Sequence, residues 1–142
     1  MITLDILFEE TAKDMPFNED LIITSKKLPY IYDKYLKYLI QHRLELTRKN
    51  KIYKQLFKEK HEYYSGRASK ETYQKNRFDI KVLRGDLPVY LEADEELAQL
   101  QEGLDFIKTK LEFLEQTLRN ITNKGYACKN LIEWEKIQNG II

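Results

Sequence analysis

The longest apolar pattern lies in the C-terminal third of the chain, where aliphatic residues recur at alternating spacings of three and four. The pattern follows Asp94, a residue type that commonly caps helix N-termini, and runs to Ile121. This heptad spacing predicts a long helix that packs against another helix in coiled-coil fashion. The same phase continues through Gly125 to Cys128 and Ile132, so the helix either continues or bends at the glycine. The positions with this spacing are Leu97, Leu100, Leu104, Ile107, Leu111, Leu114, Leu118 and Ile121.

A second long helix is predicted between Pro29 and Gly66. Leu28 or Pro29 begins it, because the first turn of a helix does not use the N–H that proline lacks. No Gly or Pro interrupts the pattern before Gly66, so the helix spans about 37 residues, or roughly 55 Å. His42, Lys49 and Lys60 point into its apolar side. The apolar residues that share one narrow face are Leu28, Ile31, Tyr35, Leu39, Leu46, Tyr53, Phe57 and Tyr64.

The rest of the chain predicts shorter elements. They are a helix at about Thr3 to Met15 that Pro16 ends, a connector at 17–27, a helix from Lys70 to about Leu83 capped by Ser69, and an irregular or briefly extended stretch at 84–92. Only five Gly and three Pro are present. So few breakers favour an all-α fold with a small number of long helices.

Apolar residues outside the heptad positions indicate that the C-terminal half contacts more than one neighbour. Phe106 and Phe113 lie off the heptad seam, and the segment 126–138 adds further apolar residues. A chain this short does not easily cover all of these faces by itself, so we expect residues 94–142 to form an oligomerisation region. The residues expected to contribute are Leu104, Ile107, Leu111, Leu114, Leu118, Ile121 and Trp134.

Charge is distributed in three blocks that the net charge of +1 conceals. Residues 1–25 have one Lys and six acids, residues 26–77 have fifteen Lys or Arg and five acids, and residues 78–142 have eight basic residues and twelve acids. Eight of the ten Tyr fall in the basic block. A basic segment rich in aromatic residues suits a polyanion with stackable faces, so single-stranded nucleic acid is the first candidate partner. A long solvated helix can also be rich in lysine.

The length of 142 residues predicts one domain, with an acidic segment at 1–25, basic tyrosine-rich helices at 26–77 and the helical region at 94–142. The single cysteine, Cys128, excludes an intrachain disulfide and fits a reducing cytoplasm. No apolar run approaches the ~20 residues of a membrane span. The N-terminus lacks the basic start and the cleavage site of a secretory signal.

Candidate catalytic chemistry is sparse. His42 and His61 have no second His or Cys at metal-ligand spacing, and the isolated glycines form no phosphate-binding loop. Cys128 lies on the heptad stripe, where a buried apolar role is expected. We therefore expect no enzymatic activity, no metal and no cofactor.

The stretch at 58–67 joins the end of the basic helix to a glycine turn and brings together two Lys, two Tyr and an Arg. Lysines contact phosphates, and tyrosine rings stack on unpaired bases with about 1–3 kcal/mol per base. The alternative is a helix terminus with capping cations and two core tyrosines. Composition alone favours neither interpretation.

The order Lys58-x-Lys60-x-x-Tyr63-Tyr64-Ser65-Gly66-Arg67 resembles the signature of the UvsY family, the recombination mediators of T4-type phages. The run Lys124-Gly125-Tyr126-Ala127-x-Lys129 resembles a second segment of that family, and the similarity covers roughly residues 50–142. Lys60 stands where the family pattern has an arginine. Lysine keeps the positive charge but lacks the planar, forked guanidinium group.

The resemblance implies a non-enzymatic protein that forms a hexameric or heptameric ring and binds single-stranded DNA in the cytoplasm of an infected bacterium. It implies two protein partners, a RecA-like recombinase to be loaded and the single-strand-binding protein to be displaced. Lys58 and Lys60 match family positions that contact DNA. With the neighbouring basic face, the predicted DNA-binding residues are Lys51, Lys54, Lys58, Lys60, Tyr63, Tyr64 and Arg67.

Two other functions remain open. An oligomeric coiled-coil adaptor, whose basic helix binds an acidic protein partner, would bind neither single strands nor duplex appreciably. A duplex-binding architectural protein would bind duplex at least as well as single strands, because its tyrosines would have no unpaired base to stack on.

Overall fold

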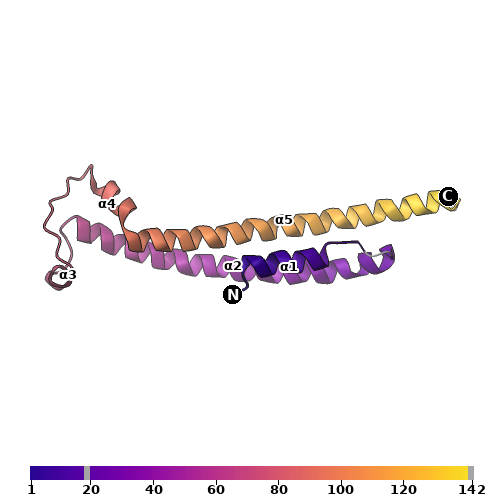
Figure 1. Cartoon of the computed structure of the whole chain (residues 1–142), viewed down its shortest axis with the longest axis horizontal. Coiled ribbons are helices and arrows are strands. Elements are labelled where there is room, and N and C mark those ends of the chain that lie inside the picture. Colours follow the sequence, from indigo (N-terminus) through magenta and orange to yellow (C-terminus); the bar gives the residue numbers. More distant parts are fainter. Residues whose placement is uncertain (18–19, 141–142) are drawn as a thin grey trace. The chain divides into compact units, whose positions relative to one another are not determined.

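The computed structural model describes residues 1–17 and 20–140, and within these ranges the chain forms helices and turns without a strand. The predicted all-α fold is confirmed. The helices in chain order are α1 (Leu4–Asp14), α2 (Leu21–Tyr64), α3 (Lys70–Lys75), α4 (Leu87–Ala93) and α5 (Glu95–Gln138), as labelled in Figure 1.

Two compact units divide the chain, and each contains part of both long helices. Unit 1 comprises Met1–Arg43 and Thr109–Ile142, and unit 2 comprises Leu44–Lys108. Unit 1 therefore consists of α1, the first half of α2 and α5 from Thr109 onward. Unit 2 consists of the second half of α2, the short helices α3 and α4, and the start of α5.

In unit 1, α1 lies alongside the first half of α2 (Figure 1), and polar contacts join them. The hydroxyl of Thr3 caps α1 by accepting from the Ile6 N–H. The ammonium of Lys34 lies 3.3 Å from a Glu10 carboxylate oxygen and 2.8 Å from one of Asp14. The hydroxyl of Tyr35 donates to that same Asp14 oxygen at 2.8 Å. The acidic N-terminal segment thus pairs with the first half of the basic block.

The part of α5 that belongs to unit 1 contacts the end of α1 through a buried lysine. Lys124 is 7% exposed, and its ammonium donates to the backbone carbonyls of Asp14 at 3.3 Å and Pro16 at 3.0 Å. These carbonyls lie at the last residue of α1 and two residues beyond it, where the helix dipole favours a cation. At the neighbouring Gly125 a β-carbon would lie 3.7 Å from Leu28 Cδ1 of α2, an ordinary van der Waals distance.

The predicted start of α2 at Leu28 or Pro29 is wrong, because α2 begins at Leu21. Asp20 provides the cap: one carboxylate oxygen accepts from the N–H groups of Ile22 at 2.9 Å and Ile23 at 3.3 Å. Pro29 therefore lies inside the helix, where it cannot donate a backbone hydrogen bond. Residues 21–27 of the predicted connector are helical, and residues 18–19 lie outside the described residues.

The heptad helix is confirmed as α5, which continues through Gly125 without a break. Leu100 is half-buried, and the other heptad side chains are buried within the single chain, with exposures from 0% at Leu114 to 8% at Leu111 and Leu118. In the single chain Trp134 is 56% exposed, whereas the other residues predicted for oligomerisation are buried. The oligomerisation role stays a prediction for all of them, namely Leu104, Ile107, Leu111, Leu114, Leu118, Ile121 and Trp134.

Unit 2 corrects two predictions about the short elements. The third helix ends at Lys75 and does not reach Leu83, because it buries no side chain that would hold further turns in place. The stretch at 84–92 is not irregular throughout, since α4 occupies Leu87–Ala93. Leu87 and Leu91 are one turn apart and pack with Leu97, and these contacts hold α4 against the start of α5.

Candidate nucleic-acid interface

The Ser-Gly-Arg part of the motif ends α2 with a regular C-terminal cap. Gly66 has a φ of 80°, a left-handed conformation that favours glycine. The Arg67 N–H donates to the Glu62 carbonyl at 2.8 Å, and the Gly66 N–H donates to the Tyr63 carbonyl at 3.3 Å. This is the Schellman pattern of hydrogen bonds. The backbone N–H groups at the turn are therefore engaged within the chain.

Lys60 and Tyr64, one turn apart on α2, both contact Asp94 at the start of α5. The Lys60 ammonium lies 3.2 Å from Asp94 Oδ2, and the Tyr64 hydroxyl donates to this oxygen at 2.6 Å. The other oxygen of Asp94 accepts from the Leu97 N–H at 3.0 Å and so caps α5, as predicted from the sequence. Asp94 is only 6% exposed. The charge of this buried carboxylate is therefore balanced by Lys60.

These contacts change the pKa of two groups. Burial alone would raise the pKa of Asp94, but hydrogen bonds from Tyr64, from the Leu97 backbone and from Lys60 together lower it. Burial raises the pKa of the Tyr64 hydroxyl, and the hydrogen bond to the Asp94 carboxylate raises it further. Both shifts favour one arrangement, a charged carboxylate that accepts from a neutral phenol.

The tyrosines of the motif belong to an aromatic cluster in unit 2. Tyr63 stacks on Tyr73 with ring centroids 5.5 Å apart and an interplanar angle of 20°. Tyr64 meets the edge of Phe78 at 5.3 Å and lies 5.8 Å from Tyr90. The Tyr73 hydroxyl donates to the Tyr63 carbonyl at 2.7 Å and thereby helps to close the end of α2. The two motif tyrosines thus have packing roles in this structure, and their contact with bases stays a prediction.

Four of the predicted DNA-binding residues point to solvent. Lys51, Lys54, Lys58 and Arg67 are exposed, and the three lysines lie on one face of α2 at spacings of three and four. Lys58 has a side chain that is 79% exposed and reaches Glu62 only at 4.0 Å. An exposed pair at this distance holds the ammonium weakly. We call Lys51, Lys54 and Lys58 the lysine face.

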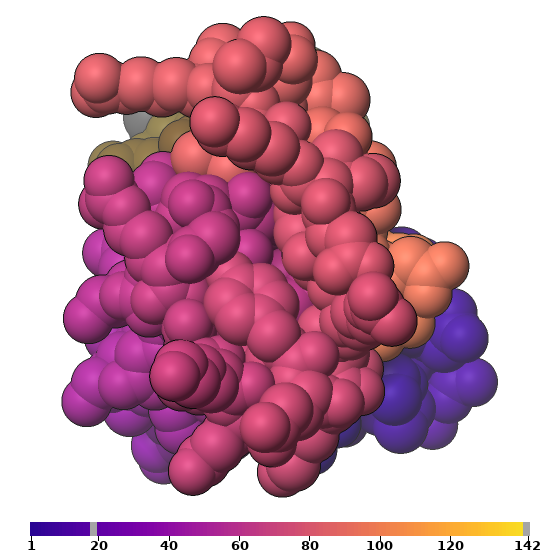
Figure 2. Space-filling model, turned by 90° about the vertical axis from the view of Figure 1, so that its left-hand side faces the viewer, coloured from indigo at the N-terminus to yellow at the C-terminus, as the bar shows by residue number. Residues whose placement is uncertain are grey.

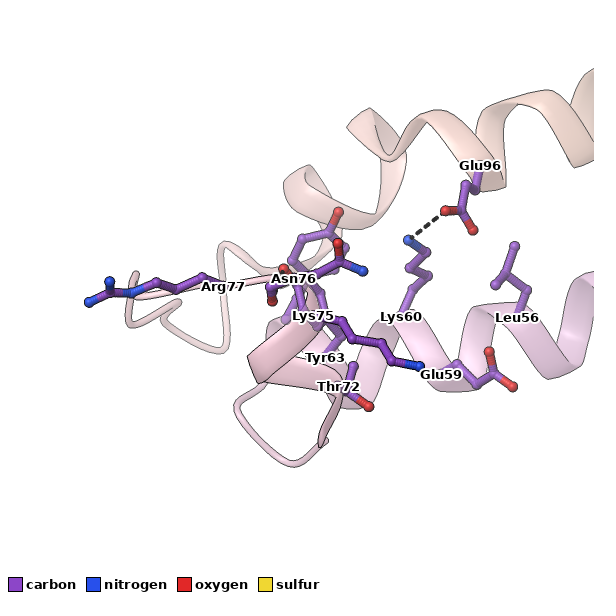
Figure 3. A pocket seen from close by; sticks show the side chains of 10 residues that line it. Leu56, Glu59, Lys60, Tyr63, Thr72, Lys75, Asn76, Arg77 and Glu96 are labelled. Carbon is purple, nitrogen blue, oxygen red and sulfur yellow. Dashed lines mark hydrogen bonds and ion pairs between the residues drawn. The ribbon is translucent and has the colours of Figure 1, made fainter. Parts of the chain in front are cut away.

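A pocket of about 620 Å³ lies beside the motif and adds cations that the sequence analysis did not select (Figure 3). Lys75 and Arg77 line it together with Lys60, and Thr72 and Asn76 contribute polar groups. Its cationic character is partly cancelled, because Glu59 and Glu96 also line it and Lys60 lies 3.6 Å from Glu96. Lys75 and Arg77 belong to the basic block, but only the fold shows that they lie beside Tyr63.

Comparison with known proteins decides the family. Residues 10–141 match the family described as "Recombination, repair and ssDNA binding protein UvsY". The chain belongs to the UvsY family. A relative in this family is the recombination protein uvsY of enterobacteria phage T4, which is 25% identical over 144 residues, with 96% of this chain and 98% of that protein covered.

Crystal structures of the bacteriophage T4 recombination mediator protein UvsY have the same fold. The lattice type II structure matches with a TM-score of 0.89 at 22% identity and covers 98% of this chain and 99% of that one. The lattice type I structure matches with a TM-score of 0.85 at 22% identity, over 94% and 98% of the two chains. The resemblance to UvsY drawn from the motifs is thereby confirmed. The individual DNA-binding residues stay predictions.

Some classes of site are missing from the described part of the chain. Residues 1–17 and 20–140 contain no cluster of three or more His, Cys, Asp or Glu arranged to hold a metal ion. None of the helices in these ranges has the length and apolarity needed to cross a membrane.

Proposed function

We propose that this UvsY-family chain is a recombination mediator that binds single-stranded DNA and helps to load a RecA-like recombinase onto DNA coated with single-strand-binding protein. The observation that supports this best is the lysine face of α2, with three exposed ammonium groups of which only Lys58 has an acid within 4.0 Å among the described residues. The protein acts by binding, without catalysis or a cofactor, in the cytoplasm of an infected bacterium.

The lysine face binds the phosphate backbone by releasing counterions, and it does so without base specificity. Its spacing along α2 lets successive ammonium groups follow a strand that lies along the helix. Each chain contributes few contacts, so its own affinity for DNA is modest. A ring of several chains, hexameric or heptameric, would raise the effective concentration of the next lysine face once the first has bound.

The exposed apolar residues at the C-terminal end of α5 supply the surface for such an assembly. Trp134 and Ile137 are each 56% exposed, Tyr126 is 65% exposed and Leu131 is 41% exposed. At 100° per residue these side chains occupy one side of the helix. They are candidates for oligomerisation beside the predicted heptad residues.

Mediation follows from this array. A strand bound across several lysine faces is held away from its coat of single-strand-binding protein and becomes available to the recombinase. The alternative is an oligomeric adaptor whose lysine face meets an acidic protein partner. The Schellman cap and the contacts to Asp94 are compatible with that alternative as well, because they stabilise the fold whichever partner the lysine face binds.

Fluorescence anisotropy on matched single-stranded and duplex oligonucleotides, across a salt series, separates these functions. We expect a preference for single strands. The substitution of Lys51, Lys54 and Lys58 by Gln should weaken binding at least tenfold and lower the salt slope by about two, at ~0.7 per phosphate contact. The control replaces three exposed lysines of α5, Lys108, Lys129 and Lys136, by Gln and should change binding little. Equal losses in both variants would refute a specific role for the lysine face.

A further inference from the structure

A second hollow lies at the end of α2, on a different face of the helix from the pocket in Figure 3. It has a volume of about 400 Å³ and lies within unit 2, in the region that Figure 2 turns toward the viewer. Three segments build it: the last turns of α2, the cap that follows them, and the stretch that leads into α4. The lining residues are His61, Ser65, Arg67, Val82, Arg84 and Leu87.

The charges of this hollow are uncompensated. Arg67 and Arg84 are both exposed, and within the described residues neither has a carboxylate at ion-pair distance. No acid lines the hollow. An adjoining hollow that shares Arg84 and His61 is also lined by Glu92, which forms no ion pair in the described part of the chain. The pocket of Figure 3, by contrast, has two acidic residues among its cations.

We propose that Arg67, Arg84 and His61 form a binding site for a phosphodiester group of single-stranded DNA, separate from the lysine face. A guanidinium group presents two parallel N–H donors that match a phosphate, and two such groups from different segments can hold one anion from two sides. A ring nitrogen of His61 supplies a third donor. The inference rests on the proposed function and adds Arg84 and His61 to the DNA-binding residues.

Local hydrogen bonds fix the backbone that presents these side chains. The Arg67 N–H is held by the Glu62 carbonyl at 2.8 Å, and the Asp86 N–H donates to the Leu83 carbonyl at 2.9 Å across the turn that contains Arg84. The Ser65 hydroxyl donates to the Glu62 carbonyl at 3.1 Å, so its proton is not available to a phosphate. Side chains, and not the backbone of the glycine turn, therefore bind the anion. The apolar side chains of Val82 and Leu87 complete the wall.

Arginine substitutions test the site. With Arg67→Gln and Arg84→Gln combined, we expect the affinity for a single-stranded oligonucleotide to fall about tenfold and the salt slope to fall by ~0.7, as for one lost phosphate contact. The lysine variants of both positions keep the charge and lose the fork, so they should retain part of the affinity. The control combines Arg119→Gln with Lys129→Gln on the exposed side of α5 and should bind as the wild type does. Thermal unfolding should be unchanged in all of these variants.

The outcomes separate this inference from the proposed function. If the lysine-face variant loses affinity while the double arginine variant binds like its control, the phosphodiester site is refuted and the proposed function stands. If the wild type binds no single-stranded DNA, both are refuted. A titration with inorganic phosphate, monitored through the NMR signals of His61, tests whether the hollow binds a free phosphate and not a phosphodiester of DNA. Saturation by free phosphate at low millimolar concentration, with unchanged DNA binding by the arginine variant, would assign the hollow to a free anion and overturn the proposal.

Discussion

Replacing Lys60 by methionine should destabilise the protein, because Lys60 balances the buried charge of Asp94. Removing one partner of a fully buried ion pair costs about 3–5 kcal/mol. The cost here should be lower, about 2 kcal/mol, since the Lys60 side chain is 20% exposed and Asp94 keeps its hydrogen bonds from Tyr64 and from the Leu97 backbone. Lys58→Met is the matched control, because its side chain is 79% exposed and its partner Glu62 lies at 4.0 Å. Its effect should stay within ~0.5 kcal/mol.

Urea unfolding followed by circular dichroism measures both variants. A double-mutant cycle with Asp94→Asn completes the test: Lys60→Met should cost clearly less in the Asp94→Asn background, because the charge it balances is absent. Equal stability of the Lys60 and Lys58 variants would refute the reasoning. DNA binding by Lys60→Met must be measured where the variant is folded, since otherwise a loss of structure would be mistaken for a lost DNA contact.

Three further predictions follow from the caps and buried charges. Gly66→Ala should cost about 1–2 kcal/mol in urea unfolding because of the left-handed φ of 80°, and Gly85→Ala, without such a φ, should cost much less; equal costs would contradict this. Because folding lowers the pKa of Asp94, its charged carboxylate stabilises the folded state. This stabilisation is complete above the ordinary pKa of 3.8 and is lost as the pH falls through the lower pKa of the folded state. The free energy of unfolding of Asp94→Asn should therefore fall less between about pH 5 and pH 2 than that of the wild type. An identical fall in both proteins would be evidence against the cap. Lys124→Met should cost about 1–2 kcal/mol through the two carbonyls it leaves unbonded, and a neutral effect in thermal unfolding would exclude that role.

Periodicity predicted the long elements well, because burial along a helix repeats with the helix itself. The heptad from Leu97 to Ile121 predicted α5 and its packing, and Gly66 marked the end of α2 because that turn needs a left-handed residue. Boundaries set by a local cap are harder to predict. The cap at Asp20 begins α2 upstream of Leu28 and Pro29, where the sequence pattern predicts the start.

The site was predictable only in part, because sequence spacing does not show contacts between distant segments. The motif at 58–67 is visible in the sequence, but its division into structural and exposed residues depends on Asp94, which lies far away along the chain. The heptad residues face their own chain for a related reason: an apolar stripe shows that a partner helix exists, and it does not show whether that helix belongs to the same chain. Arg84 stands alone in the sequence and joins Arg67 only in the fold.

The most direct test of the mediator function is the lag before a RecA-like recombinase forms filaments on single-stranded DNA already coated with single-strand-binding protein. The protein should shorten this lag, and the variant with Lys51, Lys54 and Lys58 replaced by Gln should not, although it folds normally. An unchanged lag with the wild-type protein, under conditions where it binds the DNA, would contradict the mediator function.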